Sequence, residues 1–148
     1  MQIANIMTKK VVTIKPDTTV QEIIQLMRRH HITMLPVVKD GELLGAVAES
    51  DLLLKEAPLH VPAYISFLDS IICLESLQHL EESVRKLVGN KARDLMTEPV
   101  ITVLDTDTTS TAAALMGEHK LLSLPVVNED GELVGIVSQG DIVRSLAK

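Results

Sequence analysis

The chain has 148 residues, of which 46% are hydrophobic but only 1% aromatic, and its formal net charge is −6 at pH 7. A nucleic-acid-binding surface needs a basic stripe and commonly stacking aromatic side chains, so this composition argues against nucleic acid as a partner. The length allows one compact domain, or two small halves that share an aliphatic core.

Targeting and redox signals indicate a soluble protein. The N-terminus lacks the charged start and apolar run of a secretory signal. The longest apolar stretch, residues 61–74, contains Pro62 and Asp69 and is too short to span a bilayer. The single cysteine, Cys73, lies in this run and predicts a buried thiol in a reducing compartment. We therefore expect a cytoplasmic protein without membrane insertion.

The first elements along the chain are a strand and a helix. Residues 11–14 form a β-branched run, which favours a strand. Pro16 ends that strand, and Asp17 or Thr18 can cap a helix. Four apolar residues then fall at helical spacing and predict one buried helix face: Val20, Ile23, Ile24 and Met27.

A hairpin and a second helix follow. Residues 35–38 and 43–48 read as strands, and Asp40-Gly41 between them is a strong signal for a two-residue hairpin turn. A helix begins near Ser50 and Asp51.

The second half repeats this order. Residues 100–103 predict a strand, and residues 124–127 and 133–138 predict a hairpin with a longer turn that ends in Asp130-Gly131. Asp141 opens the last helix. The intervening helix face is marked by Ala112, Ala113 and Met116. The chain therefore predicts a β-α-β-β-α unit used twice.

Residues 57–93 belong to neither unit. Residues 75–88 predict a helix with one apolar side, ended by Gly89. Two interpretations stay open: a connector that covers the core, or a subunit interface.

The two units also share their sequence. Residues 7–14 read MTKKVVTI and residues 96–103 read MTEPVITV, an offset of 89. Residues 35–51 read LPVVKDGELLGAVAESD and residues 124–141 read LPVVNEDGELVGIVSQGD, so one extra residue in the turn makes the offset 90. Such a repeat indicates a duplicated unit whose two copies pack on each other.

These motifs, in this order in both copies, resemble the CBS (cystathionine-β-synthase) domain, and the pair resembles a Bateman module of the stand-alone bacterial type. The resemblance implies an α/β (α+β) fold with two repeats packed through their sheets about a pseudo-two-fold axis. It divides the chain into repeat 1 (1–56), an insert (57–93) and repeat 2 (94–148). It also implies a homodimer and a regulatory role towards an unidentified partner protein.

The implied ligand is an adenosine nucleotide, held in a cleft between the repeats as a regulatory ligand and not as a required cofactor. AMP is the leading candidate, and ADP, ATP or S-adenosylmethionine are the others. The alternative is a ligand-free dimerisation or interaction scaffold. We expect no enzyme, because no paired acid, base or nucleophile stands out, and no metal site, because the five histidines lack ligand-like spacing.

The motif G-h-h-[ST]-x-x-D, in which h is hydrophobic, has a physical logic. Its Gly would allow close approach of a ligand, its hydroxyl would sit where a helix entrance favours phosphate, and its Asp could accept both ribose hydroxyl protons. The second copy is complete, with Ser138 and Asp141. In the first copy Ala48 replaces the hydroxyl and Glu49 adds a negative charge. Asp51 and Asp141 could equally be plain helix caps.

The resemblance implies that each cleft takes Ser and Asp from one repeat and its base-binding wall from the other. The stronger site would then comprise Thr13, Ile14, Pro16, Val37, Ile136, Ser138 and Asp141. The weaker site would comprise Thr102, Val103, Val126 and Asp51.

The charge pattern bears on the ligand. Nucleotide-sensing relatives often place a basic residue just before the L-P-V-V motif, where this chain has Met34 and Ser123. Basic residues lie just upstream, at predicted helix C-termini, where positive charge is favoured in any case: His30, His31, His119 and Lys120. They serve either as ordinary helix-end charges or as phosphate contacts. Because Met34 and Ser123 stand in place of a basic residue, AMP is favoured over the more highly charged triphosphate.

Overall fold

The computed structural model describes residues 1–56 and 89–147. The expectations for the insert helix and for Cys73 lie outside the described residues. The first half contains α1 (Val20–His30), β1 (Met34–Lys39), β2 (Glu42–Ala48) and α2 (Glu49–Glu56). The rest of the sequence contains α4 (Ala92–Leu95), which packs on the first half, and then the elements of the second half. These are β3 (Val103–Leu104), α5 (Thr109–His119), β4 (Ser123–Val127), β5 (Leu133–Ser138) and α6 (Gln139–Ser145).

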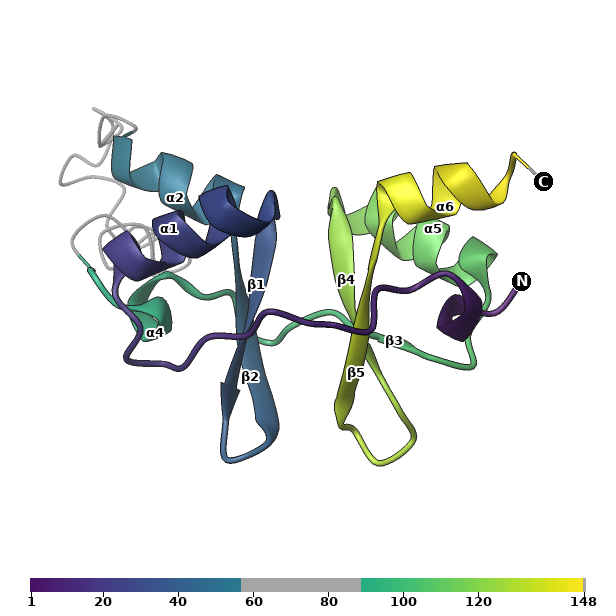
Figure 1. Cartoon of the computed structure of the whole chain (residues 1–148), viewed down its shortest axis with the longest axis horizontal. Coiled ribbons are helices and arrows are strands. Elements are labelled where there is room, and N and C mark those ends of the chain that lie inside the picture. Colours follow the sequence, from purple (N-terminus) through teal and green to yellow (C-terminus); the bar gives the residue numbers. More distant parts are fainter. Residues whose placement is uncertain (57–88, 148) are drawn as a thin grey trace, which may run out of the picture.

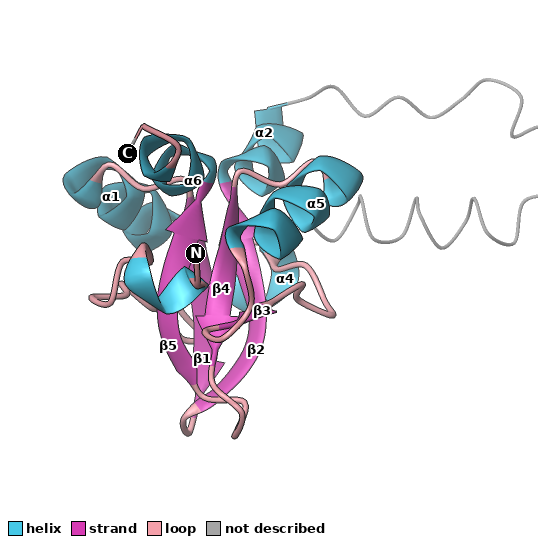
Figure 2. Ribbon diagram, turned by 90° about the vertical axis from the view of Figure 1, so that its right-hand side faces the viewer, coloured by secondary structure: helices cyan, strands magenta, loops and turns pink. Residues whose placement is uncertain are grey.

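The mixed α/β fold of two similar halves is confirmed. In Figure 1 the β1–β2 and β4–β5 hairpins lie beside each other in the middle of the molecule, with α1 and α2 outside the first and α5 and α6 outside the second. Figure 2 shows α6 on the same side of the strands as α1, and α2 on the same side as α5.

The predicted strands that precede α1 and α5 are both shorter in the structure. In the second half β3 pairs with β4 in parallel, starting at Val103, whereas in the first half Ile14 makes an isolated parallel bridge to Val37. The expected strand over residues 11–14 is therefore wrong except at Ile14, and that over 100–103 forms only at its end. The reason is that the preceding residues cross from one half of the molecule to the other.

The two turns behave as their sequences indicate. Asp40 and Gly41 have φ values of 51° and 80°, and positive φ at both positions is what a type I′ hairpin turn requires. The longer second turn is organised by Asn128, whose Oδ1 accepts hydrogen bonds from the backbone N–H groups of Asp130 at 3.0 Å and Glu132 at 2.9 Å.

The N-cap of helix α1 lies two residues after Asp17, the earlier of the two predicted caps. Thr19 is the N-cap, and its hydroxyl accepts from the Glu22 N–H at 3.3 Å. Of its predicted buried face, Ile24 is 42% exposed, whereas Val20, Ile23 and Met27 are buried.

Each half completes its core with residues that precede the other repeat's first strand in the sequence. Ile3 is fully buried in the second core, and its N–H donates to the Asp107 carbonyl at 2.9 Å. Ala92 and Leu95, from α4, are fully buried in the first core. Figure 1 shows the N-terminal segment running from the second half across to the first. The halves are therefore tied together by two crossing segments.

Candidate functional site

Ser138 and Asp141 form a reciprocal cap at the start of α6. The Ser138 hydroxyl oxygen accepts from the Asp141 N–H at 3.1 Å, and Asp141 Oδ2 accepts from the Ser138 N–H at 2.8 Å. The second carboxylate oxygen, Oδ1, pairs with Arg144 Nη2 at 2.5 Å. Asp141 thus uses one oxygen for the fold and presents the other to a long cationic side chain.

This cap forms one wall of a cleft with a volume of about 340 Å³. That volume lies within the range of about 300–1,000 Å³ that is typical of small-molecule sites. The lining residues are Thr8, Lys10, Val11, Val12, His31, Ile32, Thr33, Met34, Ser123, Ile136, Ser138, Asp141 and Arg144.

Both halves of the molecule contribute to this cleft, which is the larger of the two clefts that lie beside the two copies of the motif. Ile136 and the cap belong to β5 and α6, and Thr8 is bound to β5 through mutual backbone hydrogen bonds with Ile136, at 2.8 and 2.9 Å. Residues 10–12 come from the crossing segment, residues 31–33 from the link between α1 and β1, and Met34 from the start of β1. The cleft therefore exists only when the two halves are docked.

The larger cleft combines three kinds of surface. Lys10, His31 and Arg144 supply basic side chains, and Asp141 supplies a carboxylate. The third surface is apolar or weakly polar and is formed by Val11, Val12, Ile32, Thr33 and Met34. Cations favour a phosphate, a carboxylate favours hydroxyl donors, and an apolar wall favours a flat base.

The equivalent cleft beside the first motif copy is smaller, and its described lining residues include no basic side chain. Its volume is about 110 Å³, well below the usual range for small-molecule sites. Its described lining residues are Met34, Ala46, Ala48, Ser50, Asp51, Thr97, Pro99, Val100, Ile101, Leu121, Ser123 and Pro125, which include no Lys, Arg or His. Asp51 is 6% exposed; its Oδ2 accepts from the Ala48 N–H at 2.8 Å, and its Oδ1 lies 3.5 Å from the Thr97 hydroxyl.

The structure brings together part of the predicted stronger site. Ile136, Ser138 and Asp141 line the larger cleft, but Thr13, Ile14, Pro16 and Val37 are not among its lining residues. Ile14 and Val37 pack in the first core instead. Residues 10–12 and 31–34 also line this cleft, and they lie a few residues before the predicted Thr13 and Val37 in the sequence.

The predicted weaker site is displaced in the same way. Asp51 lines the smaller cleft, whereas Val103 and Val126 are buried in the second core and Thr102 is not among the lining residues. The first residues of each run that predicts a strand line a cleft instead: Val11 and Val12 line the larger cleft, and Val100 and Ile101 line the smaller one.

The motif glycines have a role other than the expected one. A Cβ at Gly135 would lie 2.6 Å from Met7 Sδ and 2.9 Å from the Thr8 carbonyl oxygen. A Cβ at Gly45 would similarly meet the Thr97 carbonyl oxygen at 2.9 Å. These glycines therefore make room for the Met-Thr segment that precedes each crossing, rather than for a ligand.

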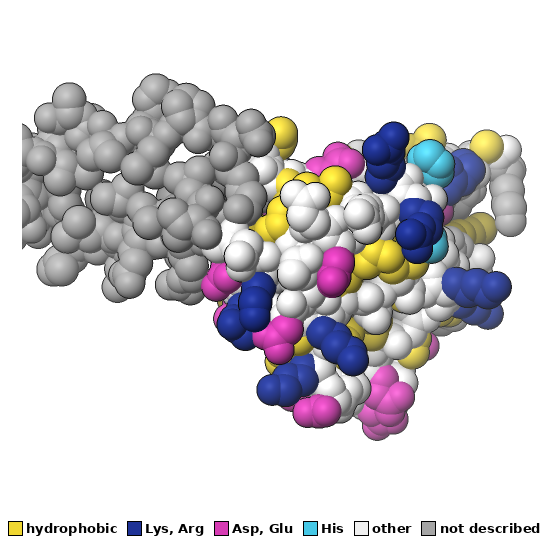
Figure 3. Space-filling view, turned by 60° about the vertical axis from the view of Figure 1, so that its left-hand side comes forward, with side chains coloured by type: hydrophobic (Ala, Val, Ile, Leu, Met, Phe, Trp, Pro, Cys, Tyr) yellow, Lys and Arg dark blue, Asp and Glu magenta, His cyan; other side chains and the backbone are white. Residues whose placement is uncertain are grey.

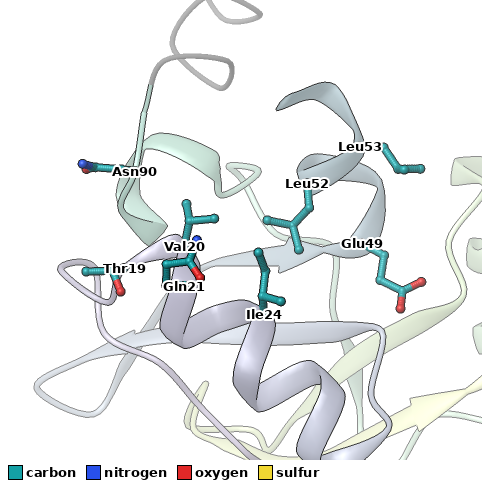
Figure 4. Close-up of a pocket in the computed structure, with 8 residues that line it drawn as sticks. All are labelled: Thr19, Val20, Gln21, Ile24, Glu49, Leu52, Leu53 and Asn90. Carbon is teal, nitrogen blue, oxygen red and sulfur yellow. The ribbon is translucent and has the colours of Figure 1, made fainter. Parts of the chain in front are cut away.

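A more open hollow of about 820 Å³ lies between α1 and α2 (Figure 4). Ile24, Leu52 and Leu53 give it an apolar floor, and Glu49 and Asn90 are among its polar lining residues. It includes none of the predicted ligand-binding residues.

The described residues also bear on metal binding, membrane insertion and nucleic-acid binding. Within residues 1–56 and 89–147, no group of three His, Cys, Asp or Glu side chains is placed to hold a metal ion. The described helices include none long and apolar enough to cross a membrane. On the face in Figure 3, Lys and Arg side chains are interspersed with Asp and Glu rather than forming one basic stripe.

The comparisons with known proteins agree with this architecture. The model of the CBS domain matches residues 3–57 and 92–148. The uncharacterized protein MJ1426 of Methanocaldococcus jannaschii is 31% identical over 154 residues, a match that covers 99% of this chain and 91% of that protein. The chloroplastic CBS domain-containing protein CBSX2 of Arabidopsis thaliana is 33% identical over 135 residues, which cover 89% of this chain but 57% of CBSX2.

Solved structures give the same result. The crystal structure of CBSX2 in complex with AMP superposes with a TM-score of 0.83 at 30% identity, covering 99% of this chain and 96% of that one. The repeated motifs, the two docked halves and these matches together show that the chain belongs to the CBS domain family, as a pair of CBS repeats.

Proposed function

We propose that this chain is a non-enzymatic regulatory module that binds AMP in the larger cleft and signals the bound state to a partner protein. The observation that carries the proposal is the convergence, in one cleft of about 340 Å³, of Asp141 with the basic residues Lys10, His31 and Arg144 and an apolar wall. The similarity to CBSX2, solved with AMP, supports AMP ahead of ADP, ATP or S-adenosylmethionine.

Each part of AMP has a matching surface. The ribose hydroxyls donate to Asp141, whose Oδ1 is not used by the cap. The phosphate lies towards the three basic side chains, because charge-assisted hydrogen bonds are the strongest that such a site offers. Adenine packs on the wall formed by Val12, Ile32 and Met34.

The smaller cleft does not take part in tight binding. It lacks the hydroxyl of Ser138, because Ala48 stands in the equivalent position, and it lacks basic lining among its described residues. We therefore assign one nucleotide to each chain.

The same module forms a homodimer in this proposal. Large apolar side chains are exposed at equivalent positions of α2 and α6: Leu53 is 68% exposed and Val143 is 65% exposed. Burying them against a second copy removes apolar surface from water, which favours association.

A thermal-shift titration tests the ligand assignment. AMP at 100 times its dissociation constant should stabilise the parent by about 2.7 kcal/mol. At the same AMP concentration Asp141→Asn should lose at least about half of that shift, because a tenfold weaker affinity leaves about 1.4 kcal/mol. Asp130→Asn, the same change in an exposed turn, should keep the full shift. No shift for the parent at millimolar AMP would favour the alternative function, a ligand-free dimerisation or interaction scaffold.

A further inference from the structure

Arg144 occupies an unusual place in the larger cleft. It lies one helical turn after Asp141, its Nη2 is 2.5 Å from Asp141 Oδ1, and it lines the cleft although its side chain is 73% exposed. Its guanidinium also lies against the start of α6, because a Cβ at Gly140 would be 3.2 Å from Arg144 Nη1. The oxygen that suits a ribose hydroxyl therefore already has a cationic partner.

The arrangement is specific to the second copy. At the offset of 90 residues, Gly140 corresponds to Ser50 and Arg144 to Leu54, so the half with Ala48 has no cation at this place in the helix. The copy with the complete Ser-and-Asp motif therefore has the arginine, and the copy without the hydroxyl has leucine at the equivalent position.

We propose that Arg144 selects phosphorylated over unphosphorylated nucleosides by exchanging partners. When the ribose hydroxyls donate to Asp141 Oδ1, the guanidinium leaves that oxygen and binds the 5′-phosphate of the same ligand. This inference rests on the proposed function, since it concerns the same cleft.

The exchange is physically favourable for two reasons. The Arg144 side chain is 73% exposed, although that of Asp141 is only 12% exposed, so water can solvate the guanidinium when it leaves the carboxylate and the ribose hydroxyls take its place there. A phosphate offers the planar guanidinium two parallel hydrogen bonds and more negative charge than the carboxylate. A ligand without phosphate would displace Arg144 from Asp141 and give it no new partner, so its binding would gain nothing from this side chain.

Calorimetric titrations with AMP and with adenosine test the exchange. The parent should prefer AMP over adenosine. Arg144→Leu, which introduces the residue of the first copy, should reduce that preference by about tenfold, because charge-assisted hydrogen bonds are lost. Its affinity for adenosine should be unchanged or slightly higher. Arg144→Lys should fall between, since lysine keeps the charge but not the paired geometry.

Arg93→Leu is the matched control. Arg93 also forms an exposed ion pair with an aspartate, Asp17, but lies outside the cleft, and its loss changes the net charge equally. It should keep the parent preference for AMP, and circular dichroism should show every variant folded.

The outcomes separate the two proposals. If the parent binds AMP but Arg144→Leu keeps its preference for AMP, or loses AMP and adenosine equally, the exchange is rejected while the proposed function stands. If the parent binds neither compound at millimolar concentration, the proposed function fails and the exchange fails with it.

Discussion

At the scale of single residues, the two carboxylate oxygens of Asp141 have different partners, and in the proposed function only Oδ1 contacts the ligand. Oδ2 accepts the Ser138 N–H at 2.8 Å, whereas Oδ1 is paired with Arg144. Asparagine at this third helical position can still accept the backbone hydrogen bond from Ser138 through its amide oxygen. It lacks the charge that strengthens hydrogen bonds from ribose hydroxyls.

Asp141→Asn should therefore weaken AMP binding by at least about tenfold with little loss of stability, because a hydrogen bond to a charged group contributes roughly 1.5–3 kcal/mol. Asp141→Ala should in addition lower the free energy of unfolding by about 0.5–2 kcal/mol through loss of the cap. Calorimetry and chemical denaturation measure the two effects. An Asn variant that binds AMP like the parent would reduce Asp141 to a helix cap.

Ser138 and Ala48 stand at equivalent positions of the two copies, so replacing each residue by the other gives a matched pair of variants. Ser138→Ala should weaken AMP binding by about twofold to tenfold, the value of one ordinary hydrogen bond. Ala48→Ser places a hydroxyl in the smaller cleft, which lacks basic lining among its described residues, and should create no second site of similar affinity. Calorimetric stoichiometry checks both, and a second equal site in Ala48→Ser would show that the hydroxyl alone decides occupancy.

At the scale of elements, the crossing segments build both the cores and the clefts. Thr8 pairs with Ile136 on β5, and Thr97 pairs with Ala46 on β2. Each contact passes over a glycine whose missing side chain makes room for it, namely Gly135 and Gly45. A change at these glycines should therefore affect stability and ligand binding together.

Gly135→Ala should lower the free energy of unfolding by about 1–3 kcal/mol, because its Cβ would overlap Met7 and the Thr8 backbone. It should also weaken AMP binding, since Thr8 lines the larger cleft. Gly117→Ala is the matched control: Gly117 lies in α5 with nothing within 4 Å of its Cβ position, so alanine should stabilise by about 0.4–1 kcal/mol. Urea denaturation distinguishes them, and equal effects would refute the packing role of Gly135.

The elements also show why some of the site was predictable and some was not. The Asp40-Gly41 turn and the capping role of Asp141 depend on residues close in sequence, and the local pattern indicates both, although it does not identify Ser138 as the N-cap. The wall formed by Val11, Val12 and Ile32 depends on a crossing between halves that β-branched composition cannot reveal. The same run that predicts a strand therefore forms cleft lining, and the residues expected as lining, such as Ile14, form core.

At the scale of the whole molecule, association is the first property to test. Exposed Leu53 and Val143 occupy equivalent positions of α2 and α6, so both halves offer apolar helix surface. Light scattering at micromolar concentration should give the mass of a dimer, twice 16.2 kDa. Val143→Glu should shift the population towards monomer without unfolding it, whereas glutamate at Ala113, an exposed position in α5, should not. A monomeric parent would contradict the proposed dimer.

The central claim is that one cleft per chain binds AMP, and calorimetric titration of the parent protein with AMP tests it most directly. The larger cleft has Ser138, Asp141 and three basic lining residues, and the smaller one has Ala48, Asp51 and no described basic lining residue. We expect a single class of site, with one AMP bound per chain. Two sites of equal affinity per chain, or no heat of binding at millimolar AMP, would contradict it.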